Sequence, residues 1–154
     1  MNRMGSNLTR HLVPNAVAES VTRQDDGAPI RRAYGFELVL DLHGCEAELF
    51  NRDHIDNFFT DLCALIEMEK CEVHFWDDVG VPEEERQTLP HTKGTSAVCF
   101  ILTSTIVIHT LDILGAVYVN IFSCKPFDPN VAAEFTSERF KAVSCKKTFI
   151  ERTL

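Results

Sequence analysis

Four side chains able to take part in covalent or proton-transfer chemistry lie within one apolar stretch of this 154-residue chain, between residues 95 and 124. They are Ser96, Ser104, His109 and Cys124. A serine hydroxyl can act as a nucleophile, an imidazole moves protons near neutral pH, and a thiol can donate one. Taken singly, each has an ordinary structural interpretation, as a turn serine, a hydrogen-bonded core histidine or a packed cysteine.

The elements around these residues follow from hydrophobic periodicity. Three β-rich runs, over residues 95–102, 105–110 and 116–122, are separated by short breaks and predict an antiparallel meander. Ser104 then lies in the turn between the first two of these strands. His109 lies five residues further on, along the strand that leaves that turn.

The rest of the chain is predicted to form two helices, three more strands and one long loop. Alternating apolar residues over 36–42 predict a strand, and apolar residues at helical spacing over 55–66, after a cap at Asn51 or Asp53, predict a helix. Residues 71–76 predict a second strand, and the polar stretch 77–94 an exposed loop.

A final helix is expected to begin at Asp128-Pro129 and to bury Val131, Phe135 and Phe140, before a last strand over 144–151. The order β-α-β-β-β-α-β predicts an α+β fold, in which one antiparallel sheet carries two helices packed on one face. Residues 1–33 show no lasting apolar period and are expected to form a flexible N-terminal arm, leaving 34–154 as the domain.

Composition excludes several classes of function. The formal net charge of −8 argues against a nucleic-acid partner, because phosphate binding favours a basic surface. Six cysteines without a C-x-x-C pair indicate reduced thiols, not a disulfide framework, and no spacing matches a metal site. No segment has the pattern of a signal peptide or membrane span, so a cytoplasmic protein is expected.

The run from Gly94 to Thr110, followed by Ile121-Phe122-Ser123-Cys124, resembles the core of the small bacterial and archaeal S-adenosylmethionine decarboxylases. Members of that family carry a glycine-x-serine start, a serine at a cleavage site, an isoleucine-histidine-threonine and a phenylalanine-(Thr/Ser)-cysteine. Ser96, Ser104, His109 and Cys124 match these at ungapped spacings. The stretch from Tyr34 to Cys45 also resembles the first strand of the family and the turn that follows it.

The resemblance implies a self-made cofactor. In the family, the serine hydroxyl attacks the preceding carbonyl, and elimination leaves a pyruvoyl group, an electron sink that forms a Schiff base with the substrate amine. The matching bond here is Thr103-Ser104. By the same resemblance, Ser96 and His109 assist processing, and Cys124 returns a proton to the substrate carbon.

The resemblance further implies an α+β sandwich that forms a homodimer, with a site shared between protomers. It also implies a small amino-acid substrate. Phe75 or Trp76 matches the place of an aromatic residue that stacks on adenine, and core packing is expected for at least one of the two. We expect Ser104, His109 and Cys124 to share one pocket.

Several positions depart from the family pattern. Thr103 and Thr105 stand where the family has glutamate and histidine around the cleaved serine, and Leu111-Asp112-Ile113 replaces its Trp-Pro-Glu, whose glutamate helps to hold substrate. Asp112 is a candidate replacement for that carboxylate. Three hypotheses stay open: a decarboxylase of S-adenosylmethionine for spermidine synthesis, the same cofactor used on arginine or ornithine, and an uncleaved member that acts as a binding or regulatory subunit.

Overall fold

The computed structural model describes residues 33–154, and the predicted arm lies outside them except for Ala33. The eight main elements lie where the sequence predicts runs of strand and helix, and their bounds lie within a few residues of the predicted ones. Four strands, not three, separate the two helices, so the predicted order β-α-β-β-β-α-β lacks one strand. They are β1 (Ala33–His43), α1 (Arg52–Leu65), β2 (Lys70–Trp76), β3 (Ser96–Ile101), β4 (Ser104–Leu111), β5 (Ala116–Ser123), α2 (Pro129–Arg139) and β6 (Ser144–Thr153).

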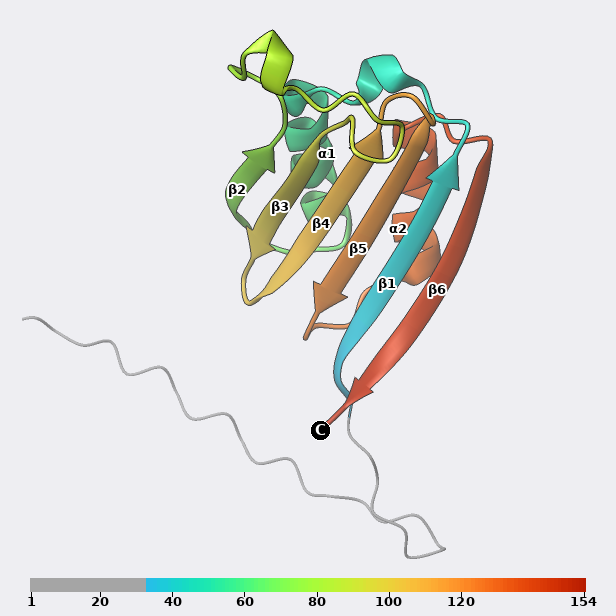
Figure 1. Ribbon diagram of the computed structural model, residues 1–154. Coiled ribbons are helices and arrows are strands. Elements are labelled where there is room, and N and C mark those ends of the chain that lie inside the picture. Colours follow the sequence, from blue (N-terminus) through green and yellow to red (C-terminus); the bar gives the residue numbers. More distant parts are fainter. Residues whose placement is uncertain (1–32) are drawn as a thin grey trace, which may run out of the picture. The chain divides into compact units, whose positions relative to one another are not determined.

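The strands form one antiparallel sheet in the order β2-β3-β4-β5-β1-β6. The predicted meander is confirmed as β3-β4-β5, and the first strand of the chain inserts between β5 and the last strand. Both helices cover the same face of the sheet, behind it in Figure 1. The predicted α+β fold class is therefore confirmed.

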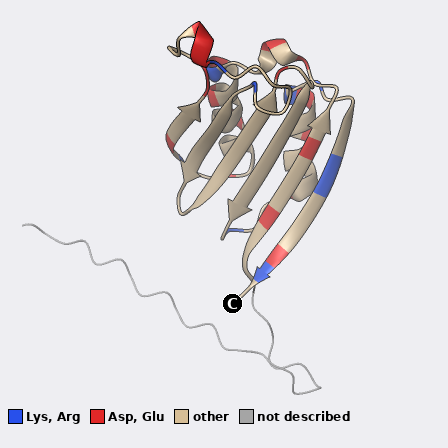
Figure 2. Ribbon diagram, viewed as in Figure 1, with Lys and Arg blue, Asp and Glu red and all other residues tan. Residues whose placement is uncertain are grey.

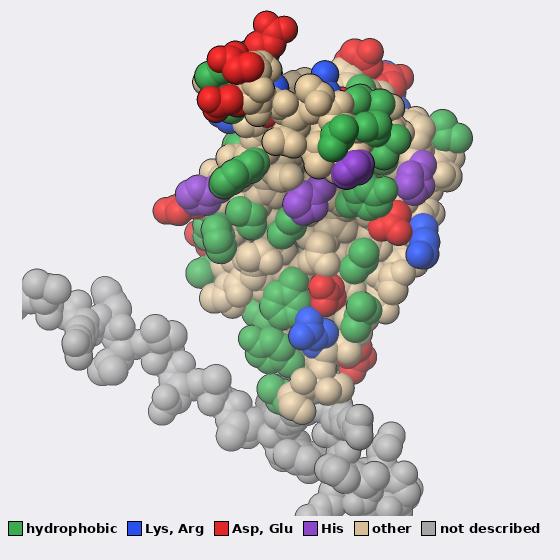
Figure 3. All heavy atoms as spheres, viewed as in Figure 1, with side chains coloured by type: hydrophobic (Ala, Val, Ile, Leu, Met, Phe, Trp, Pro, Cys, Tyr) green, Lys and Arg blue, Asp and Glu red, His purple; other side chains and the backbone are tan. Residues whose placement is uncertain are grey.

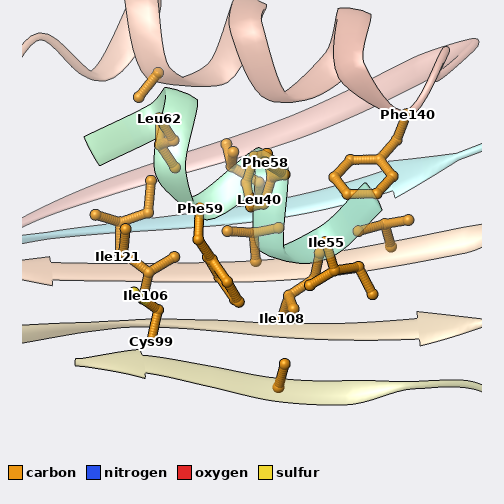
Figure 4. Packing of buried hydrophobic residues seen from close by; sticks show 14 of the residues in the cluster. Leu40, Ile55, Phe58, Phe59, Leu62, Cys99, Ile106, Ile108, Ile121 and Phe140 are labelled. Atoms are coloured by element: carbon orange, nitrogen blue, oxygen red, sulfur yellow. The ribbon is translucent and has the colours of Figure 1, made fainter. Parts of the chain in front are cut away.

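The core lies between the sheet and the two helices. Alternate residues of the strands point toward the helices and are buried, among them Leu40, Cys99, Ile106, Ile108 and Ile121 (Figure 4). Helix α1 contributes Ile55, Phe58, Phe59 and Leu62, and Phe140 packs edge-on against Phe58 from the end of α2. This packing fixes which residues of each strand face away from the helices.

Local signals explain the helix boundaries. The Asn51 side chain accepts a hydrogen bond from the His54 N–H and caps α1, and Asp128 caps α2 in the same way, with Pro129 in its first turn. One core prediction is wrong: Val131 is exposed, and α2 instead buries Ala132, Ala133 and Thr136. The small residues allow the helix to approach the sheet closely.

The second face of the sheet has no helix over it in the described part of the chain. Apolar side chains from all six strands are exposed or half-buried on this face, which is turned toward the viewer in Figure 3. They are Val39, Trp76, Val98, Phe100, Val107, Phe122 and Ile150. We call this surface the open face. Within residues 33–154, no helix is long and apolar enough to cross a membrane.

Candidate active site

Ser104 is the first residue of β4, directly after the β3–β4 turn, and its side chain is buried. The end of β5 brings Cys124 next to it: the Cys124 N–H donates to Ser104 Oγ at 3.1 Å, and the Ser104 hydroxyl donates to Cys124 Sγ at 3.8 Å. Thr103 Oγ1 lies 3.4 Å from the same sulfur. Both residues of the predicted cleavage site therefore contact one thiol.

These contacts change the acidity of the thiol. Hydrogen bonds from the Thr103 hydroxyl, and next from the Ser104 hydroxyl, lower the pKa of Cys124 below the ordinary cysteine value, because they stabilise the thiolate. Cys124 is also exposed. An exposed cysteine of lowered pKa is the kind that exchanges protons and reacts.

Ser96 and His109 form a second pair, in which Ser96 Oγ lies 2.7 Å from His109 Nδ1. They are directly opposite each other on β3 and β4. Two features keep the chain just before β3 close to β4. A Cβ at Gly94 would collide with the Thr110 carbonyl oxygen, so only glycine fits there, and the Thr95 N–H donates to Thr110 Oγ1 at 2.9 Å. The glycine of the glycine-x-serine start is thus required for the backbone to reach β4.

The two pairs do not meet within one chain. Ser104 and His109 are five residues apart on β4, which at about 3.3 Å per residue separates them by roughly 17 Å. Because the separation is odd, Ser104 points toward the helix layer and His109 toward the open face. The expectation that Ser104, His109 and Cys124 share one pocket does not hold inside a single protomer.

A hollow of about 700 Å³ lies beside the Ser96–His109 pair. Trp76 and Tyr118 line it from the neighbouring strands β2 and β5, since Trp76 pairs with Ser96, and His109 pairs with Tyr118. Trp76, predicted as a candidate for stacking, is 84% exposed there. Tyr118 was not among the site residues predicted from the sequence. Alternation over 116–122 gives its face, but only the β4–β5 register places it opposite His109.

The other two predicted substrate residues are placed differently. Phe75 lines the edge of the same hollow, but it packs against the core, and the Arg52 guanidinium lies 5.5 Å from the centre of its ring. Asp112 lines a second hollow of about 720 Å³, above the start of α1, and not the one beside His109. Burial raises the pKa of the Asp112 carboxyl.

An ion pair ties the loop after β2 to the start of α1. Arg52 donates two hydrogen bonds to the carboxylate of Asp77, at 2.7 and 2.6 Å. The hydrogen bonds from Arg52 hold the pKa of Asp77 below its usual range. Acidic residues gather at this end of the sheet, around the turn Glu83–Glu85, whereas β3, β4 and β5 carry no Asp, Glu, Lys or Arg (Figure 2).

Sequence comparison gives a consistent result. The sequence model of the S-adenosylmethionine decarboxylase family matches residues 36–153. The chain is 28% identical over 124 residues to the S-adenosylmethionine decarboxylase proenzyme of Acetivibrio thermocellus, covering 78% of this chain and 89% of that protein. It is 29% identical to the proenzyme of Caldicellulosiruptor saccharolyticus, covering 79% and 90% respectively.

The fold is similar to a solved structure. The crystal structure of the adenosylmethionine decarboxylase from Aquifex aeolicus VF5 superposes with a TM-score of 0.63 at 18% identity, covering 80% of this chain and 93% of that one. At this identity, the likeness bears on the fold alone. The match over residues 36–153 covers both helices and all six strands described above, β1 from residue 36 onward.

Proposed function

This chain belongs to the S-adenosylmethionine decarboxylase family, and we propose that it is a pyruvoyl-dependent decarboxylase of S-adenosylmethionine that cuts itself at Thr103-Ser104. The observation that carries the proposal is the contact of both Thr103 and Ser104 with the Cys124 thiol. In this arrangement, the serine that would be modified already lies beside the residue that would deliver a proton to substrate. The residues present at this turn, Thr103, Ser104 and Cys124, thus fit the formation and use of a pyruvoyl group at position 104.

Maturation would use the groups at the β3–β4 turn. Ser104 Oγ attacks the Thr103 carbonyl carbon, the C–N bond breaks, and the hydroxyl proton passes to the released amine, leaving an ester. Removal of the Ser104 α-proton then breaks the Cβ–O bond and releases a chain that ends in the Thr103 carboxylate. The dehydroalanine that remains at 104 takes up water and loses ammonia. The α-proton needs a base, and an imidazole suits this step.

His109 of the same chain cannot supply that base, because roughly 17 Å of strand separates it from Ser104. We infer that a second copy does so, with the open faces of two protomers packed together. The apolar side chains of the open face support this pairing, because a monomer would leave them in water. The complete site would then join Ser104 and Cys124 of one protomer to Ser96 and His109 of its partner.

In the mature enzyme, the pyruvoyl group would supply the electron sink for loss of CO₂. Cys124 Sγ would deliver a proton to the substrate carbon that has lost CO₂. Ser96, through its hydrogen bond to Nδ1, would fix the orientation of the His109 ring and leave Nε2 free to accept or donate a proton. Trp76 would cover the substrate in the hollow next to this pair.

Mixed dimers test the shared site directly. The His109→Ala chain keeps its serine, and the Ser104→Ala chain keeps its imidazole, so co-expression of the two should restore cleavage of the His109→Ala chain at Thr103-Ser104. Intact mass measures the two fragments. The matched control replaces the second chain by one carrying both substitutions, which should restore nothing. Equal cleavage in the control, or none in either mixture, contradicts the proposal.

A second candidate function uses the same cofactor on another amino acid, arginine or ornithine. It is favoured by Ile113, an exposed apolar residue at the family's glutamate position. Release of labelled CO₂ from S-adenosylmethionine, arginine and ornithine, with Ser104→Ala as the control, separates the two candidates. An uncut chain by intact mass would instead support a non-catalytic family member.

A further inference from the structure

The hollow beside His109 lies between the open face of the sheet and the loop after β2. Across its floor run Trp76, Ser96, His109 and Tyr118, on four neighbouring strands. Loop residues, including Asp78, line its other side. The hollow is thus bounded by aromatic rings on the sheet and by carboxylates on the loop.

The carboxylate expected after β4 is absent from this hollow. Ile113 takes the position of the family's glutamate, is 53% exposed and lines neither hollow. Asp112, the neighbouring acid, faces the hollow above α1, and its backbone N–H donates to the Lys93 carbonyl at 3.0 Å. Neither residue offers an acceptor next to Trp76.

Asp78 does offer one. It lines the hollow beside His109 as well as the one above α1, and its Oδ2 accepts a hydrogen bond from the Gln87 N–H at 3.0 Å. Its carbonyl accepts from the Val81 N–H at 3.1 Å, and the adjacent Asp77 is anchored by Arg52. A carboxylate that is already ordered loses little conformational freedom when it binds a ligand. Glu85 lines the same hollow from an exposed turn.

We propose that Asp78 is the specificity-determining carboxylate of this chain, accepting hydrogen bonds from the ribose hydroxyls of the substrate beside Trp76. The inference rests on the proposed function for its substrate. Carboxylates are good acceptors for paired hydroxyl groups, and a nucleoside offers its base to an aromatic ring at the same time. Asp78, on the loop over residues 77–94, would thus take the substrate-binding role of the family's glutamate, which the apolar Ile113 cannot fill.

Trp76 is the single tryptophan of the chain, so its fluorescence reports directly on the hollow. The probe is 5′-methylthioadenosine, which has the ribose and adenine but neither sulfonium nor carboxylate and undergoes no reaction. We expect saturable quenching with the Ser104→Ala chain, and binding about tenfold weaker when Asp78→Asn is added. The matched control is Glu83→Gln, an acid of the same loop that lines the other hollow, and it should leave affinity unchanged.

Three results would overturn the inference: no saturable quenching in the parent, equal affinity with and without Asp78→Asn, or a loss of affinity with Glu85→Gln or Asp112→Asn and not with Asp78→Asn. Failure of the proposed reaction is distinguishable. If the wild-type chain releases no CO₂ from S-adenosylmethionine but Asp78 still governs probe binding, the reaction is wrong and the inference stands. If CO₂ is released with an unchanged KM in Asp78→Asn, the inference fails alone.

Discussion

At the scale of single residues, the most informative feature is the thiol of Cys124 between two hydroxyls. Thr103 and Ser104, which lower its pKa, are the two residues that cleavage would alter. In the uncut chain the thiolate is stabilised. After cleavage, the Ser104 hydroxyl would be gone and Thr103 would end in a carboxylate, which opposes a negative sulfur. Maturation would therefore favour the protonated thiol that the reaction needs.

Removing one hydroxyl tests this effect. In an uncleaved His109→Ala background, Thr103→Val should raise the pKa of Cys124 and so lower its thiolate fraction at neutral pH. Alkylation of Cys124 by iodoacetamide at pH 7 should then slow several-fold, measured by peptide mass spectrometry. Cys71 and Cys145, also exposed, are internal controls and should react at unchanged rates. Equal rates for Cys124 in both chains would show that Thr103 does not affect the thiol.

At the scale of elements, the loop over residues 77–94 is held to the domain at its first residue. The bidentate Arg52–Asp77 pair joins the end of β2 to the first turn of α1, and the Asp77 side chain is only 5% exposed. Since Asp77 is followed directly by Asp78, the pair also positions the carboxylate proposed to hold substrate.

The Arg52–Asp77 pair gives stability a pH dependence of known sign. Because the folded state lowers the Asp77 pKa, the pair stabilises the fold above the unfolded value of about 3.9 and loses its effect as the pH falls through the folded value. Asp77→Asn should lower the thermal unfolding midpoint by a few degrees at pH 7. The difference from wild type should shrink steadily as the pH falls below about 3.9.

Circular dichroism melts from pH 7 to pH 2.5 measure this trend. The control is Glu134→Gln, an exposed acid on α2, which should leave the midpoint unchanged throughout. A deficit in Asp77→Asn that is the same at every pH would mean that the carboxylate charge plays no part.

At the scale of the whole molecule, the sheet has two unlike faces. One is covered by α1 and α2 and forms the core, and the other carries an apolar surface (Figure 3). The Ser96–His109 pair lies on this second face, at the end of β3 and β4 that is remote from the turn between them. Packing two open faces together would bury that surface, give four layers, and bring each protomer's His109 to its partner. Assembly and catalysis would then depend on the same surface.

A charge in the middle of the open face should separate the protomers. Val107→Glu, on β4 between Val98 and Asn120, would have to be buried without a partner and should raise the dimer dissociation constant at least about tenfold. Self-cleavage should fall with it. Light scattering after size-exclusion chromatography measures the assembly, and intact mass the cleavage.

Leu65→Glu is the matched control, because Leu65 is an exposed apolar residue of α1 on the helix side of the sheet. It should leave both assembly and cleavage unchanged. A folded Val107→Glu monomer that cleaves at the wild-type rate would contradict the shared site.

The sequence by itself determined the elements and the fold class. Period-two and helical patterns located every main strand and helix, because burial of one face imposes its period on the residues. Asn51 was one of two cap candidates given by residue type, with Asp53 the other, and Ser96, Ser104, His109 and Cys124 stood out by their spacing. Val131 was misplaced because α2 is short and its apolar residues do not form one clear stripe.

Tertiary structure alone decided which candidates meet. Distance along a strand and the face on which a side chain lies depend on register and on where the helices pack, and spacing in the sequence carries neither. Hence Ser104 lies with Cys124, and Ser96 with His109, although all four stand in one short run. The same geometry directs Asp112 away from Trp76 and brings Asp78 and Tyr118 to the hollow, since contacts across strands and from a loop are fixed only when the sheet assembles.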